Sequence, residues 1–153
     1  MKTVLPRLLV ACLLALLPCA TATAAENSFV GAAACESCHE EQYASFMANS
    51  RKAHSWRSIE KMAPKLTHNE IRECYTCHTT GYGQPGGFVS LEKTPQLANV
   101  SCEACHGPGA AHAESGDPED IHRTPDIKSC SECHNAQRVK NFNFKPMLYH
   151  GGH

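Results

Sequence analysis

The chain has 153 residues, of which 14 are basic, 15 are acidic and 10 are histidine, and its formal net charge is −1. This balanced charge offers no basic surface, so nothing in the composition indicates binding to nucleic acid or to an anionic membrane. Residues 26–153 contain only 17 Leu, Ile, Val and Phe residues, which is too few for an ordinary side-chain core.

The first 25 residues have the three parts of a secretory signal peptide. Lys2 and Arg7 form the basic start, an apolar run follows at 8–17, and small residues occupy 20–25. The apolar run is too short to cross a bilayer, so we expect no retained membrane span. Cleavage after residue 25 would leave one domain, 26–153, in the periplasm or another exported location.

Helical patterns dominate the first half of this domain. Apolar spacing predicts a helix over 33–63, with a bend near Asn49 and Ser50 and an end at Pro64. Thr67 and Glu70 form a predicted capping box for a second helix that continues to residue 81. Two methionines on the first helical stretch, Met47 and Met62, are interpreted as packing residues.

The second half contains more turn residues. Glycine and proline at 81–95 predict a loop with a short extended piece at 88–91. A Gly-Pro-Gly run at 107–109 should stop a third helix, and Ser129 with Glu132 is predicted to cap a fourth helix that reaches about residue 140. We therefore expect a mainly α protein with extensive loops and almost no sheet.

Four segments share the pattern Cys-x-x-Cys-His, which attaches c-type haem: two thiols make thioethers to the porphyrin and the histidine is the proximal iron ligand. They are Cys35, Cys38 and His39; Cys74, Cys77 and His78; Cys102, Cys105 and His106; and Cys130, Cys133 and His134. Zinc-ribbon pairs and disulfides are the alternatives, but neither requires a histidine after each second cysteine. We expect four covalently bound haem c groups, with short helices wrapped around them in place of the missing apolar core.

The second axial ligand of each iron decides between two kinds of chemistry. An iron with histidine on both sides passes electrons, whereas an open iron can bind a small molecule. Six further histidines are available in the mature chain: His54, His68, His112, His122, His150 and His153. We favour His54, His112 and one tail histidine, His150 before His153, as ligands; His68, His122 and Met147 remain alternatives.

Several runs resemble the cytochrome c-554 family of tetrahaem cytochromes. They are the segment 29–34 before Cys35, the segment 40–43, the run Lys52, Ala53, His54, and the segment 102–112. The resemblance covers nearly the whole mature chain. It implies a periplasmic protein that takes electrons from a hydroxylamine-oxidising enzyme and whose haems are stacked in closely spaced pairs.

The same resemblance implies a set of axial ligands. His112 would ligate the iron held by His39, and His54 the iron held by His134. A tail histidine, His150 or His153, would ligate the iron held by His106. The iron held by His78 would be five-coordinate. This chain is shorter than the family pattern after the fourth motif.

Three functions fit these expectations. The favoured one is an electron carrier with mostly bis-histidine haems that relays electrons between redox protein partners in a respiratory chain. The alternatives are a reductase of a small nitrogen or oxygen species at an open haem on His78, and a subunit of a conducting cytochrome filament. No motif has lysine in place of the proximal histidine, and no other catalytic group stands out. The pattern specifies neither the donor and acceptor nor the oligomeric state.

Overall fold

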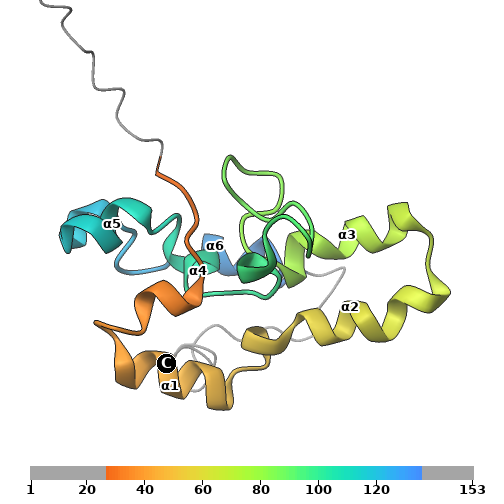
Figure 1. Ribbon diagram of the computed structural model, residues 1–153, viewed down its shortest axis with the longest axis horizontal. Coiled ribbons are helices and arrows are strands. Elements are labelled where there is room, and N and C mark those ends of the chain that lie inside the picture. Colours follow the sequence, from red (N-terminus) through yellow and green to blue (C-terminus); the bar gives the residue numbers. More distant parts are fainter. Residues whose placement is uncertain (1–26, 136–153) are drawn as a thin grey trace, which may run out of the picture.

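The computed structural model describes residues 27–135, and this part is helical with extensive loops and no strand (Figure 1). It confirms the predicted mainly α fold class. The predicted signal peptide and the tail residues Met147, His150 and His153 lie outside the described residues.

The first helical stretch is divided into several short elements. A 3-10 turn, η1 (Ala32–Cys35), precedes α1 (Glu40–Asn49), and η2 (Arg51–His54) precedes α2 (Trp56–Met62) and η3 (Ala63–Lys65). The predicted bend is confirmed, because α1 ends at Asn49 and Ser50 is extended. The prediction of one helix that begins with the first motif is wrong, because α1 begins only after His39.

The apolar residues of α2 do not all pack. Ile59 is 3% exposed, whereas Met62 is 47% exposed. The interpretation of Met62 as a packing residue is therefore wrong. Pro64 lies in η3, directly after α2 ends.

The helix α3 (His68–His78) begins where the sequence predicts. The backbone N–H of Glu70 donates to Thr67 Oγ1 at 3.4 Å, and the N–H of Thr67 donates to Glu70 Oε2 at 2.8 Å. These two bonds confirm the capping box. The helix ends at His78, earlier than predicted, because Thr79 is extended. The helices α2 and α3 lie side by side (Figure 1).

The loop after α3 folds back on itself and forms a small core. Thr80 receives a hydrogen bond at its carbonyl from the N–H of Phe88 at 2.9 Å and donates its own N–H to Leu97 O at 3.0 Å. The predicted extended piece at 88–91 does not form a strand. The core consists of aromatic and apolar residues from this loop and its neighbours: Phe29, Phe88, Leu97 and Ala98, with Trp56, Tyr75 and Tyr82 packed against them.

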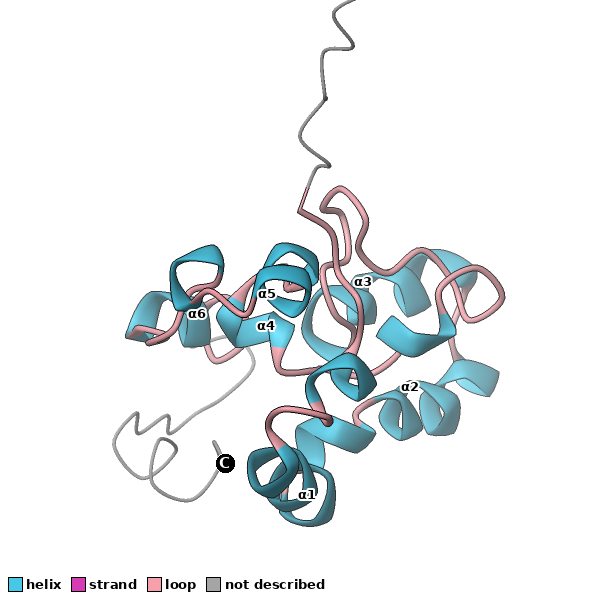
Figure 2. Cartoon of the chain, turned by 60° about the vertical axis from the view of Figure 1, so that its left-hand side comes forward, coloured by secondary structure: helices cyan, strands magenta, loops and turns pink. Residues whose placement is uncertain are grey.

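The remaining helices are short. They are α4 (Glu103–His106), α5 (Ala110–Ser115) and α6 (Ile127–Ser131), with η4 (Pro95–Leu97) before α4 and η5 (Pro118–Asp120) between α5 and α6. These three α-helices form one half of the molecule, and α2 and α3 lie in the other (Figure 2).

The caps of these helices were only partly predicted. The helix α4 ends at the predicted Gly107. The predicted cap by Ser129 and Glu132 is wrong, because Asp126 caps α6 through the N–H groups of Lys128 and Ser129 at 2.9 and 3.1 Å.

Candidate functional site

Each Cys-x-x-Cys-His segment forms a single helical turn. The N–H of the histidine donates to the carbonyl of the first cysteine at 3.0 Å in the first and third motifs and at 2.9 Å in the fourth. The second motif lies at the end of α3. Residues four apart in such a turn lie on the same side, so the first cysteine and the histidine face one space.

Three of the predicted ligand histidines have the same orientation. Nδ1 lies 3.1 Å from Ser55 O in His78, 2.9 Å from His122 O in His106 and 2.8 Å from Asp117 O in His112. A carbonyl oxygen only accepts, so Nδ1 carries the hydrogen and Nε2 keeps its lone pair. Metal-ligating histidines are held in this way in proteins.

The rings of His39 and His112 lie near each other in a stacked arrangement. Their ring centres are 6.2 Å apart and their planes differ by 27°. An imidazole nitrogen binds a metal ion at about 2 Å and the ring centre lies about 1 Å further back, so two rings on opposite sides of one ion have centres about 6 Å apart. The spacing of these two rings therefore fits an iron atom between them.

His54 is placed differently. Its Nε2 lies 2.9 Å from the carbonyl oxygen of Met47. Its neighbour Lys52, in the same 3-10 turn, lies near the fourth motif: the pKa of His134 is lowered by burial and by the charge of Lys52. The turn η2 thus lies beside the fourth motif, and the ring of His54 is hydrogen-bonded to the Met47 carbonyl at the end of α1.

The two less favoured histidines are both exposed. His68 lies at the first turn of α3. His122 contributes its main chain: its carbonyl accepts from His106 Nδ1, and its N–H donates to His106 O at 3.0 Å.

Three pairs of motifs are in contact. The thiols of Cys35 and Cys102 lie close enough for a hydrogen bond. This bond, followed by burial, raises the pKa of Cys35. Cys133 Sγ donates to the carbonyl of Thr76, inside the second motif, at 3.7 Å. Burial and the charge of Cys77 raise the pKa of Cys133 to about 12. The helices α4 and α6, from the third and fourth motifs, also touch. The motifs therefore lie in the spatial order first, third, fourth, second.

The donor set fits c-type haem better than the two alternatives. All eight motif cysteines are free thiols. A zinc ribbon requires two cysteine pairs to converge on one ion. Within residues 27–135, no three His, Cys, Asp or Glu side chains converge in a way that could hold a metal ion.

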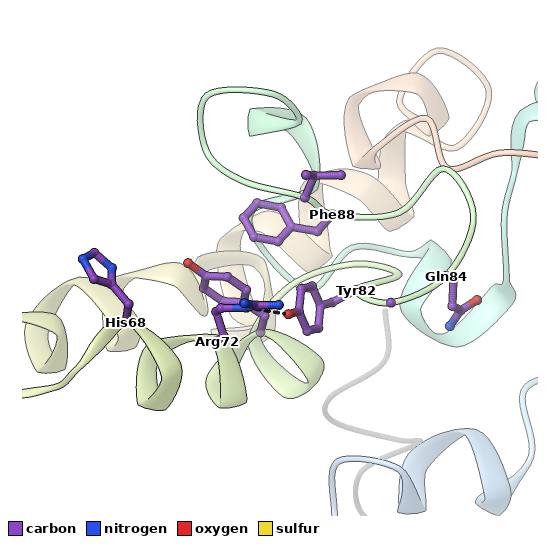
Figure 3. Close-up of a pocket in the computed structure, with 8 residues that line it drawn as sticks. His68, Arg72, Tyr82, Gln84 and Phe88 are labelled. Carbon is purple, nitrogen blue, oxygen red and sulfur yellow. Dashed lines mark hydrogen bonds between the residues drawn. The ribbon is translucent and has the colours of Figure 1, made fainter.

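One pocket lies outside the attachment turns, on α3 (Figure 3). Its volume is about 440 Å³, and its lining includes His68, Arg72, Tyr75, Tyr82 and Phe88. The spacing of residues 68, 72 and 75 places them on one face of α3, away from the side of the second attachment pair. Arg72 Nε donates to Tyr82 Oη at 3.4 Å across the pocket.

Two residues that position the motifs were not found from the sequence. Ser55 Oγ donates to His78 O at 2.8 Å, and the Ser55 carbonyl oxygen accepts from His78 Nδ1 at 3.1 Å. Glu103, inside the third motif, is 2% exposed and accepts three backbone hydrogen bonds. A main-chain carbonyl leaves no signal in a sequence, and Glu103 has the same place in its motif as the exposed Glu36.

Among the helices of the described part, none is long and apolar enough to span a bilayer.

Comparisons with known proteins found one family model and one curated relative. Residues 34–107 match the family model described as cytochrome c554 and c-prime. The chain is 32% identical over 131 residues to a cytochrome c-554 from Nitrosomonas europaea, a match that covers 76% of this chain and 55% of the relative. It thus spans about half the length of the curated relative. No solved structure matches it. The matched region contains three of the attachment turns and the contacts between the first and third, and the chain therefore belongs to the cytochrome c-554 family.

Proposed function

We propose that the chain is an exported, periplasmic electron-transfer protein that binds four c-type haems, mostly with two histidine ligands, and relays electrons between redox protein partners in a respiratory chain. Membership of the cytochrome c-554 family supports the coarse function, electron transfer by covalently bound haem c. The signal-like segment at 1–25 supports export.

The facing rings of His39 and His112 carry the proposal. Their separation of 6.2 Å suits two ligands of one iron, and Nδ1 of His112 is held by the Asp117 carbonyl. His39 and His112 would together fill both axial positions of that iron, and such an iron would pass electrons rather than bind a small molecule. When bound, each haem supplies an iron that cycles between two oxidation states.

The chain's own contribution is to hold the attachment turns in a fixed order. Contacts link the first turn to the third, the third to the fourth and the fourth to the second. Each haem would therefore have a neighbour along this series. Cys77 and Cys133 would be among the attachment points of one adjacent pair, and Cys35 and Cys102 of another.

Intact mass and spectroscopy of the purified protein test the proposal. We expect a mass that corresponds to the mature chain plus four haems. We also expect mostly low-spin iron in the oxidised protein. A mass without added haem would refute haem binding. A large high-spin fraction, together with binding of carbon monoxide by the reduced protein, would favour the reductase alternative at the His78 haem.

The His112→Ala variant tests the axial pair directly. Removing this imidazole should convert one haem from low-spin to high-spin and leave the haem count unchanged. The matched control is His68→Ala, which removes an exposed histidine from the first turn of α3 and should leave the spectrum unchanged. A His112→Ala protein with the native spectrum would remove this residue from the ligand set.

A further inference from the structure

The Glu103 carboxylate is buried inside the third attachment turn, directly after Cys102, and the electron relay proposed above does not use it. Three backbone N–H groups donate to it: Val30 to Oε1 at 2.9 Å, Gly109 to Oε1 at 2.8 Å and Gly31 to Oε2 at 2.7 Å. A buried charge is tolerated only where such partners surround it. Because all three partners are donors, the site suits an ionised carboxylate, which has only acceptors.

The three N–H donors belong to two segments of the chain, one that ends at an attachment cysteine and one that contains a predicted axial histidine. Val30 and Gly31 directly precede η1, which ends at Cys35. Gly109 is the N-cap of α5, which contains His112. One carboxylate thus connects the first turn, the third turn and the helix of the second axial ligand.

The backbone is shaped for this contact. Gly31 has φ +88°, a left-handed conformation that favours glycine. At Gly109, an added Cβ would lie 3.2 Å from Glu103 Oε1, tighter than an ordinary contact. Both glycines therefore let their N–H groups approach the carboxylate closely.

The charge also acts on both neighbouring thiols. The pKa of Cys35 is raised by its hydrogen bond with Cys102, by burial and by the charges of Cys102 and Glu103. The Glu103 charge likewise acts to raise the pKa of Cys102, against the larger lowering effect of its hydrogen bond with Cys35. These two sulfur atoms are attachment points of different haems in the proposed function. The Glu103 carboxylate therefore lies close to an attachment point of each of these two haems.

We propose that Glu103 is a positioning residue that fixes the spacing between the first and third attachment turns and lowers the reduction potentials of the haems they hold. A negative charge favours the oxidised iron, which is the more positive state. Its effect is large here because a buried charge is screened less than an exposed one. The inference rests on the proposed function, since it requires haem at both turns.

Redox titration of the full haem-loaded protein tests this inference. In Glu103→Gln, the amide oxygen can replace Oε1 and keep the bonds from Val30 and Gly109, while the amide nitrogen faces the N–H of Gly31. We expect at least one haem potential to rise, with a tenfold change in the ratio of reduced to oxidised iron, which equals about 59 mV for one electron.

Glu36→Gln is the matched control. Glu36 follows the first cysteine of its motif, as Glu103 does, but it is exposed. Its replacement should leave every potential at the wild-type value. A folded Glu103→Gln protein with wild-type potentials, or an equal rise in both variants, would overturn the proposal.

If the Glu103→Gln protein does not fold, infrared spectroscopy tests the proposal instead. The reduced-minus-oxidised difference spectrum of Glu36→Gln, prepared with and without isotope-labelled glutamate, should contain a label-sensitive carboxylate band. Its absence would overturn the proposal. The haem count of the wild-type protein separates this outcome from a failure of the proposed function.

Discussion

The first and second attachment turns have the same five-residue pattern, but different interactions hold them in shape. The first follows the 3-10 turn η1, and the two residues before η1, Val30 and Gly31, donate their N–H groups to the Glu103 carboxylate, more than 70 residues away in the sequence. The second is the end of the 11-residue helix α3, which has its own capping box. The same covalent chemistry can therefore rest on long-range contacts in one place and on local helix formation in another.

The largest expected effect comes from removing a haem, either from the third turn, which contains Glu103, or from the second turn at the end of α3. Cys102→Ala with Cys105→Ala should lose one haem and also the protection of the Val30 and Gly31 amides, because their acceptor Glu103 lies within the emptied turn. Cys74→Ala with Cys77→Ala should lose one haem and keep most of α3. Intact mass and amide hydrogen exchange measure both effects.

Equal loss of protection around Val30 and Gly31 in these two double variants would contradict the comparison. It would show that both regions depend on haem to the same degree.

A smaller effect is expected at the cap of α3. Thr67→Ala removes the side-chain acceptor of the capping box and should cost about 1 kcal/mol of unfolding free energy. Chemical denaturation measures this cost, with the exposed loop variant Thr124→Ala as the control. A cost near zero would show that α3 depends on tertiary contacts rather than on its cap.

The cap also predicts a pH dependence. Hydrogen bonds from the N–H and hydroxyl groups of Thr67 hold the pKa of Glu70 below its ordinary value of 4.5. A carboxyl with a lowered pKa stabilises the fold above its unfolded pKa, and this stabilisation is lost as the pH falls through the lower folded value. The difference between wild type and Thr67→Ala should therefore shrink on acidification below pH 4.5.

The smallest expected effect is at the pocket on α3. Tyr82→Phe removes the acceptor of the 3.4 Å bond from Arg72, which is exposed, and keeps the ring packed against Tyr75. The unfolding free energy should change by less than about 0.5 kcal/mol. A larger loss would mean that this hydrogen bond, and not the aromatic packing, fixes the loop after α3.

Local signals in the sequence predicted several features correctly. The Thr67 and Glu70 pair correctly predicts the start of α3. The predicted bend near Asn49 and Ser50 is confirmed, and so is the predicted end of α4 at Gly107. Each of these depends on residues within one or two turns of each other. The cap of α6 was missed because Asp126, three residues before Ser129, accepts from the N–H groups of Lys128 and Ser129, so the helix begins at Ile127 and Ser129 lies inside it.

The sequence by itself determined the chemistry that depends on short spacing: four pairs of thiols, each with a histidine beside it, and a helical chain poor in apolar residues. Only the tertiary structure decided which groups meet across the fold. Short spacing alone does not pair His39 with His112, 73 residues away; the resemblance to the cytochrome c-554 family implies this pair, and the structure places the two rings 6.2 Å apart. Glu103 is buried although its motif counterpart Glu36 is exposed. The reason is physical: a covalent attachment needs one turn of chain, whereas the pairing of distant side chains depends on the path of all the residues between them.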